Sequence, residues 1–212
     1  MATSAPKSYS SPFHRHLLPL GQNRRLRRRI GVMGGSFNPA HHGHYQISIS
    51  ARKSACLAEV WWLVSPQNPL KSETGMASLA SRLSFARQHY SSSWLRIADF
   101  EEKMQLQRTY DTLKALKRAL PLCDFIWIMG ADNLIQLPQW HQAAKIAAEF
   151  SILVMNRPGY GYRALAGKGG FMLSARWRKS HPRALNRRQR GWSFVPAPNH
   201  AISATQIRQQ AS

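Results

Sequence analysis

The amino-acid sequence predicts an α/β protein in which one domain is built on a doubly wound, mainly parallel sheet. Short apolar runs alternate with segments of helical periodicity through most of the 212 residues. This alternation favours parallel pairing, because each connection between neighbouring strands then passes through a helix. The chain length and the hydrophobic content of 43% are sufficient for one such domain with a sizeable core.

Strands are expected where short apolar runs are bounded by turn residues. The run Glu59–Val64 (EVWWLV) is apolar after its first residue, as a parallel strand buried on both faces should be. The other runs that predict strands are Ile30–Met33, Trp94–Ala98, Asp124–Met129, Phe150–Met155 and Trp192–Val195.

Helices are expected where apolar residues recur at intervals of three and four. The predicted helices are Tyr45–Leu57, a segment marked by Met76, Leu79, Ala80, Leu83 and Ala86, then Thr109–Leu120 and Gln139–Glu149. Ser203 is expected to cap a terminal helix. Residues 161–190 are rich in Gly and Arg and have little periodicity, so they are predicted to form a loop region.

The first 29 residues contain no acidic residue and are rich in Ser, Pro and Arg, so we expect a disordered extension before a domain of residues 30–212. Their composition loosely resembles an organelle transit peptide, and a translation start near Arg29 is an alternative. The cysteines Cys56 and Cys123 are expected to be buried, reduced thiols, which suits the cytoplasm. No apolar run approaches the length of a membrane span, so no membrane association is expected.

The charge balance points to polyanionic partners. Thirty basic residues stand against nine acidic ones, which gives a formal net charge of +21. Nucleotides, nucleic acid and anionic membranes all fit such a balance. Many of the basic residues lie in two blocks, 24–29 and 176–190. We interpret these blocks as solvated segments attached to an ordinary domain, rather than as a dedicated nucleic-acid surface.

The stretch Ile30–His44 (IGVMGGSFNPAHHGH) predicts a phosphate site, because a strand leads into two adjacent glycines and then into a helix. Glycines let the backbone approach a ligand closely, and a helix start offers unpaired N–H groups to an anion. His41 and His44 add side-chain donors at that place. The spacing fits neither GxxxxGK[ST] nor GxGxxG. A zinc site is disfavoured, since no CxxC or HExxH partner accompanies the histidines, and no metal ligands are assigned.

The stretch contains Gly35, Phe37, Pro39, His41, Gly43 and His44. In these residues it resembles the GxFxPxHxGH motif of the HxGH nucleotidyltransferases. Near the C-terminus, residues 202–208 (ISATQIR) resemble the ISSTxIR motif of the same superfamily, except that Ala204 stands where a second Ser is usual. Four further stretches are similar to bacterial nicotinate-nucleotide adenylyltransferases: Ser65–Lys71, Thr109–Leu113, Gly130–Trp140 and Arg157–Tyr160. At the position before Thr109, where members of that family often have Tyr, this sequence has Arg108.

The resemblance implies a Rossmann-like nucleotidyltransferase fold and an enzyme of NAD biosynthesis. Members of the family transfer AMP from ATP to nicotinate mononucleotide and release pyrophosphate. The product is nicotinate adenine dinucleotide, also called deamido-NAD. The acceptor attacks directly and in line, without a covalent intermediate, because it is already a phosphate anion. The implied cofactor is Mg²⁺, carried with ATP.

The resemblance also assigns roles to residues of this sequence. The catalytic residues it implies are His41, His44 and Arg208. The residues it places at ATP are Gly34, Gly35, Ser36, Phe37, His41, His44, Asp132, Ser203, Thr205 and Arg208. Those it places at nicotinate mononucleotide are Lys71, Thr109, Gly130, Asn133, Trp140 and Arg157. For Asp132 the alternative to a role at ATP is capping of the following helix. For Trp140 the alternative to a role at the nicotinate nucleotide is packing in the core.

Several alternatives stay open. The same fold could use nicotinamide mononucleotide or phosphopantetheine as acceptor. The stretches Gly130–Asn133 (GADN) and Arg157–Tyr160 (RPGY) argue against phosphopantetheine. A nucleic-acid-binding protein is the alternative from another class, but the sequence contains no recognised binding module. The sequence leaves the oligomeric state open, including a homo-oligomer.

Overall fold

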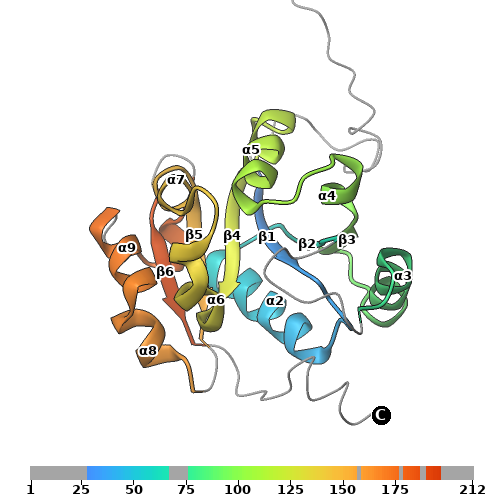
Figure 1. The fold of residues 1–212 in the computed structure, drawn as a ribbon, viewed down its shortest axis with the longest axis horizontal. Helices are drawn as coiled ribbons and strands as arrows, with labels where there is room; N and C mark the ends of the chain where they lie inside the picture. The colour runs from blue at the N-terminus through green and yellow to red at the C-terminus, as the bar shows by residue number, and fades with distance from the viewer. Residues whose placement is uncertain (1–27, 67–75, 157–158, 177–178, 187–189, 197–212) are drawn as a thin grey trace, which may run out of the picture.

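The computed structural model describes residues 28–66, 76–156, 159–176, 179–186 and 190–196. They form a six-stranded sheet in the order β3-β2-β1-β4-β5-β6, and every neighbouring pair is parallel. The order reverses at β1, as in a doubly wound fold (Figure 1). The predicted fold class is therefore confirmed.

Each predicted strand is present, with end points that differ by at most a few residues. These strands could be predicted from apolar runs because the central strands are buried: all residues of β2 and β5 are buried. The strands are β1 (Arg29–Gly35), β2 (Glu59–Val64), β3 (Leu95–Ala98), β4 (Asp124–Gly130), β5 (Ser151–Met155) and β6 (Trp192–Val195).

The helices lie between these strands. The first four are α2 (His42–Ala55), α3 (Leu79–His89), α4 (Phe100–Lys103) and α5 (Thr109–Ala119). After β4 come α6 (Ala131–Gln136), the 3₁₀ turn η1 (Leu137–Gln139) and α7 (Ala143–Glu149). After β5 come α8 (Gly161–Ala166), α9 (Lys168–Arg176) and the 3₁₀ turn η2 (Pro182–Ala184). The terminal helix predicted from Ser203 lies outside the described residues.

Two helix predictions were wrong in part. The single helix expected over Gln139–Glu149 begins only at Ala143, because the preceding Gln142 has a φ of 56° and is left-handed. The loop predicted over 161–190 contains α8 and α9 instead. Tertiary packing overrides the weak local preference there, since Ala164 and Leu173 are buried in the core beside α6 and α7.

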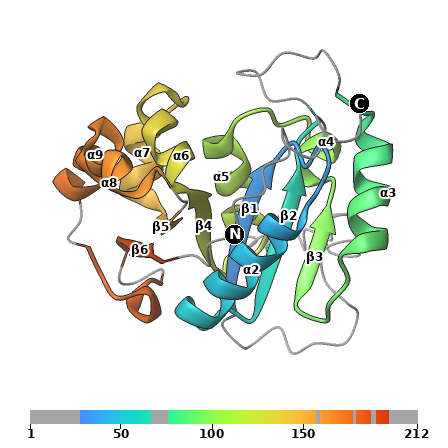
Figure 2. The same cartoon turned by 90° about the horizontal axis from the view of Figure 1, so that it is seen from below.

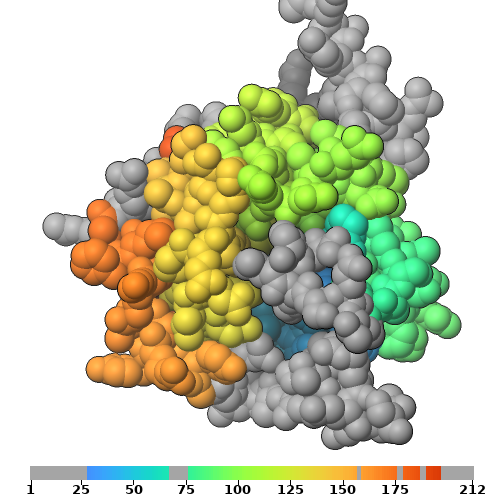
Figure 3. Space-filling model, in the orientation of Figure 1, coloured from blue at the N-terminus to red at the C-terminus, as the bar shows by residue number. Residues whose placement is uncertain are grey.

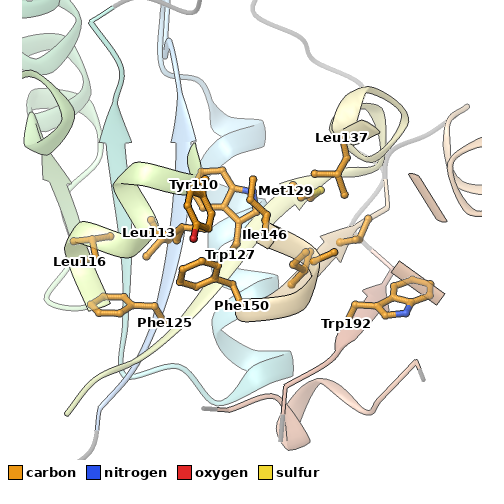
Figure 4. Packing of buried hydrophobic residues seen from close by; sticks show 14 of the residues in the cluster. Tyr110, Leu113, Leu116, Phe125, Trp127, Met129, Leu137, Ile146, Phe150 and Trp192 are labelled. Atoms are coloured by element: carbon orange, nitrogen blue, oxygen red, sulfur yellow. The ribbon is translucent and has the colours of Figure 1, made fainter. Parts of the chain in front are cut away.

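Helices cover both faces of the sheet (Figure 2). Side chains alternate between the faces along β4, where Trp127 and Met129 enter one core and Ile126 and Ile128 enter the other. The first core is filled by α5 to α9, and Figure 4 shows its aromatic members packed above the strands. The second core is filled by α2 and α3. Both faces of the central strands are therefore buried, which leaves their carboxyl ends for a ligand.

The cysteines only partly match the expectation. Cys123 is a buried free thiol as predicted, but Cys56 is exposed. Cys56 ends α2 in a left-handed conformation with a φ of 49°, and this places it at the surface. None of the helices in the described part of the chain combines the length and apolar character that a membrane crossing requires.

Candidate active site

Gly34 and Gly35, which were expected to form a turn after the first strand, are instead the last two residues of β1, and the chain turns after them. We call the segment 34–39 the glycine turn. A Cβ atom on Gly34 would lie 2.7 Å from Cη2 of Trp127, so a side chain there would displace the tryptophan. The carbonyl of Gly35 accepts a hydrogen bond from the backbone N–H of Ser65 at 2.9 Å, which extends the β1–β2 ladder by one residue. The turn therefore follows a strand end that contacts Trp127 of β4 on one side and Ser65, after β2, on the other.

Phe37 gives the turn its shape. Its φ of 45° is in the left-handed region, which is costly for a bulky residue and needs support from its surroundings. The ring is 2% exposed and stacks on Trp62, with ring centroids 5.0 Å apart and an interplanar angle of 20°. A turn at Asn38–Pro39 follows, and the peptide bond between these two residues is cis. Phe37 is therefore anchored in the core rather than exposed to a ligand through its ring.

His41 and His44 lie at the start of α2. His41 is the N-cap residue, with an extended backbone, and its side chain is 8% exposed. The ring centroids of the two histidines are 3.8 Å apart. The backbone N–H of His41 donates to Nδ1 of His44 at 3.2 Å. Because Nδ1 accepts, the neutral imidazole of His44 carries its hydrogen on Nε2, which makes Nε2 a donor.

The position of His44 is fixed by Phe37 and by two residues that sequence reasoning missed, Trp62 and Ser48. Its ring centroid lies 4.8 Å from that of Phe37 and 6.0 Å from that of Trp62. Its carbonyl accepts from Ser48 Oγ at 2.8 Å, and the same Oγ accepts from Trp62 Nε1 at 2.7 Å. Ser48 lies four residues after His44, so the only sequence signal was a small polar residue on the buried side of the helix.

The end of β4 lies beside the glycine turn, because β1 and β4 are adjacent strands. A Cβ atom on Gly130 would collide with the carboxylate of Asp132, which therefore folds back over the strand end. Asp132 is in the first turn of α6, where a negative charge favours the helix. The N-cap of α6 is Gly130 rather than Asp132, so Asp132 does not occupy the capping position. Asn133, the next residue, is half-buried.

Trp140 is also linked to the glycine turn. It is half-buried and packs against the first core. Its ring meets that of Trp127 edge-on, with centroids 6.3 Å apart and an interplanar angle of 80°. Trp127 in turn covers Gly34. Trp140 therefore has the core-packing role that the sequence left as its alternative, and it is connected to the glycine turn through Trp127.

Thr109 opens α5, and a buried carboxylate ties this helix to the end of β2. Glu101 of α4 accepts from Thr112 Oγ1 at 2.9 Å and from Ser65 Oγ. Burial raises the pKa of the Glu101 carboxyl, although the two hydroxyl donors act in the opposite direction. Sequence reasoning missed Glu101, because the role of this residue depends on contacts with Ser65 and Thr112, which lie outside its own helix.

The structure therefore brings most of the described candidates to one edge of the sheet, at the ends of β1 and β4 and the start of α5. In the space-filling view, blue atoms of β1 and α2 are visible beside yellow atoms of the α6 region (Figure 3). No group of three potential metal-binding side chains occurs within the described ranges. The candidates outside those ranges are Lys71, Arg157, Ser203, Thr205 and Arg208.

The sequence matches known proteins over most of its length. Residues 32–210 match the family model described as cytidylyltransferase-like. A protein of Parvibaculum lavamentivorans named probable nicotinate-nucleotide adenylyltransferase is 39% identical over 184 residues, which cover 86% of this chain and 92% of the relative. A protein of Gluconobacter oxydans with the same name is 39% identical, with 85% of this chain and 94% of the relative covered.

Solved structures show the same fold at lower identity. The nicotinic acid mononucleotide adenylyltransferase of Plasmodium falciparum, complexed with APC, aligns with a TM-score of 0.62 and 17% identity. The alignment covers 86% of this chain and 83% of that protein. A second structure of that enzyme is complexed with NaAD. The match over nearly the whole domain and the identity to the bacterial relatives establish the family: this chain belongs to the cytidylyltransferase-like family and, within it, to the nicotinate-nucleotide adenylyltransferases.

Proposed function

We propose that this protein transfers AMP from ATP to nicotinate mononucleotide, forming nicotinate adenine dinucleotide and pyrophosphate in NAD biosynthesis. The observation that carries the proposal is the hydrogen bond from the His41 N–H to Nδ1 of His44, which leaves Nε2 of His44 as a donor at the mouth of a glycine turn. The relatives that share this domain are named for the same reaction.

In this mechanism the protein positions the reactants and neutralises charge. The acceptor phosphate is an anion, so it needs no general base, and it attacks the α-phosphate in line while pyrophosphate leaves. Nε2 of His44 donates to an oxygen of the α-phosphate, where negative charge develops. His41, with the backbone of Gly34, Gly35, Ser36 and Phe37, contacts the triphosphate. The N–H groups at the start of α2 favour the same anion.

The C-terminal motif completes the triphosphate site in this proposal. Ser203 and Thr205 donate to the β- and γ-phosphates, and Arg208 makes a charge-assisted contact to the same groups. ATP enters with Mg²⁺, whose ligands are phosphate oxygens and water. Asp132 lies beside the adenosine or the water shell of the metal, in addition to its place at the start of α6.

The acceptor is assigned to the neighbouring strand end. Gly130 ends β4, Asn133 lies in the following helix α6, and Thr109 opens α5, so the three approach the same edge as the histidines. Trp140 offers the exposed part of its ring to the pyridine, and the basic residues Lys71 and Arg157 approach its phosphate or carboxylate. We place the reaction in the cytoplasm, because both cysteines are free thiols.

The test is direct. The full chain is incubated with ATP, Mg²⁺ and nicotinate mononucleotide, and the dinucleotide and pyrophosphate are measured by chromatography and a coupled assay. Equimolar formation of both products supports the proposal. Hydrolysis of ATP without the dinucleotide, or no turnover by folded protein, contradicts it.

A further inference from the structure

Arg82 of α3 is a cation buried beneath the candidate site. Its side chain is only 2% exposed, although a guanidinium is among the groups least often buried. Its nitrogens donate to four backbone carbonyl groups: Nε to Ala77 at 2.9 Å, Nη1 to Ser36 and to Ser65 at 2.8 Å, and Nη2 to Pro66 at 3.0 Å. One side chain therefore holds together the turn after β1, the end of β2 and the start of α3.

Among the residues that the structure describes, no carboxylate forms an ion pair with Arg82. All its hydrogen-bond partners in the described part of the chain are carbonyl oxygens. A buried arginine is usually paired with an acid, because an uncompensated charge is costly to bury. Here the positive charge lies directly below a turn assigned to a triphosphate. Bound phosphate would place negative charge close to this buried cation.

The contact with Ser36 has a geometric consequence for Phe37. The bond between these residues is a trans peptide, in which the carbonyl and the N–H point in opposite directions. When Arg82 binds the Ser36 carbonyl from below, the N–H of Phe37 is turned to the opposite side. The same peptide leads into the left-handed backbone of Phe37, which needs such support.

The position of Phe37 in turn affects the position of His44. Its ring packs against His44, with centroids 4.8 Å apart, and stacks on Trp62. A change in the Ser36–Phe37 peptide would therefore move both a backbone donor and the wall that holds His44. Displacements of about 1 Å at such a site can cost on the order of a hundredfold in rate.

We propose that Arg82 is a positioning residue for the triphosphate: it fixes the Ser36 carbonyl and thereby turns the N–H of Phe37 toward the ATP phosphates and holds His44 in place. This inference rests on the proposed function, since it assigns ATP to the turn after β1. Arg82 acts through the backbone and does not touch the substrate.

The test uses Arg82→Met and Arg82→Lys in the full chain, with Arg87→Met as the matched control. Methionine keeps the buried stem of the side chain but donates no hydrogen bond, whereas lysine keeps the charge and reaches fewer carbonyl groups. Arg87 is an exposed arginine of the same helix that binds the Ile97 carbonyl, at 3.1 and 3.3 Å. Steady-state kinetics are measured for both substrates, with the folded fraction determined by circular dichroism.

We expect Arg82→Met to raise the KM for ATP by about tenfold or more, with the KM for nicotinate mononucleotide within about twofold. Arg82→Lys should lie between this variant and the parent, and Arg87→Met should match the parent. A KM is independent of the amount of folded enzyme, so a lower stability alone cannot produce this pattern.

Three results would overturn the inference: an unchanged KM for ATP in folded Arg82→Met, an equal rise in both KM values, or a failure of Arg82→Lys to fold. The last would make Arg82 a folding residue. If only Arg82→Met fails to fold, Arg82→Lys carries the same comparison. A parent protein that forms no dinucleotide contradicts the proposed function instead, and the two failures are thereby distinguished.

Discussion

The backbone N–H of His41 donates to Nδ1 of His44 at a distance of 3.2 Å, so the cap of α2 selects the tautomer of the second histidine. With Nδ1 as acceptor, Nε2 of the neutral ring is a donor. Phe37, Trp62 and Ser48 hold the rest of the residue, from its ring to its carbonyl. The geometry of one side chain thus depends on the turn, on β2 and on the next turn of α2.

The first prediction concerns this donor. His44→Ala should lower kcat by about a hundredfold or more, as expected for the loss of one donor to a developing negative charge. The KM for nicotinate mononucleotide should change far less, because the contact strengthens mainly in the transition state. His42→Ala is the matched control, since His42 is exposed and contacts Gln46 on the outer side of α2. A folded His44→Ala protein with a kcat near that of the parent would refute the role.

Arg208 provides a second prediction, based on the sequence. Arg208→Ala should raise the KM for ATP strongly and leave the binding of nicotinate mononucleotide almost unchanged, because the acceptor lies on the far side of the α-phosphate. Arg208→Lys should keep partial activity, since lysine retains the charge and loses the planar fork. Kinetic constants within about twofold of the parent in the alanine variant would reduce the C-terminal motif to a helix cap.

The third prediction concerns Glu101 and pH. Burial raises the pKa of this carboxyl above its ordinary value of 4.5, so the folded protein binds more protons than the unfolded chain in the interval between the two pKa values. The contribution of Glu101 to the free energy of unfolding is therefore fully present below the ordinary pKa and decreases as the pH rises through the raised one. Glu101→Gln removes this dependence and keeps one oxygen acceptor, while its NH2 group can donate to the hydroxyl that bound the other carboxylate oxygen.

The measurement is denaturant unfolding of parent and Glu101→Gln between about pH 4 and about pH 8. The difference in free energy, parent minus variant, should fall as the pH increases. Glu102→Gln, an exposed neighbour on the same short helix, controls for the general loss of one negative charge. A difference that is constant over this range, or that increases with pH, would show that burial does not govern Glu101.

The sheet was predictable because its strands are apolar on both faces. Glu59–Val64 is the clearest example, since all six of its residues are buried and the predicted limits are those of β2. The segment after β5 was not predictable in the same way. Gly161, Gly167, Gly169 and Gly170 weaken helical preference, and α8 and α9 form because Ala164 and Leu173 fill the core.

The candidate site was predictable only as far as local sequence encodes it. The glycines and histidines around α2 lie within one short stretch, and strand order then brings Gly130 beside them. Arg82 and Glu101 were missed because their roles depend on contacts with residues far away in the sequence, such as Ser36 and Ser65. An arginine or a glutamate in a helix has the same sequence pattern whether it is buried or solvated.

The most direct test of the account compares the two pyridine nucleotides as acceptors. The full chain is supplied with ATP, Mg²⁺ and either nicotinate mononucleotide or nicotinamide mononucleotide, and kcat/KM is determined from pyrophosphate release. The account predicts a clearly higher kcat/KM for nicotinate mononucleotide, because N–H donors around Thr109, Gly130 and Asn133 would face a carboxylate rather than a neutral amide. An equal or higher kcat/KM with nicotinamide mononucleotide would contradict it.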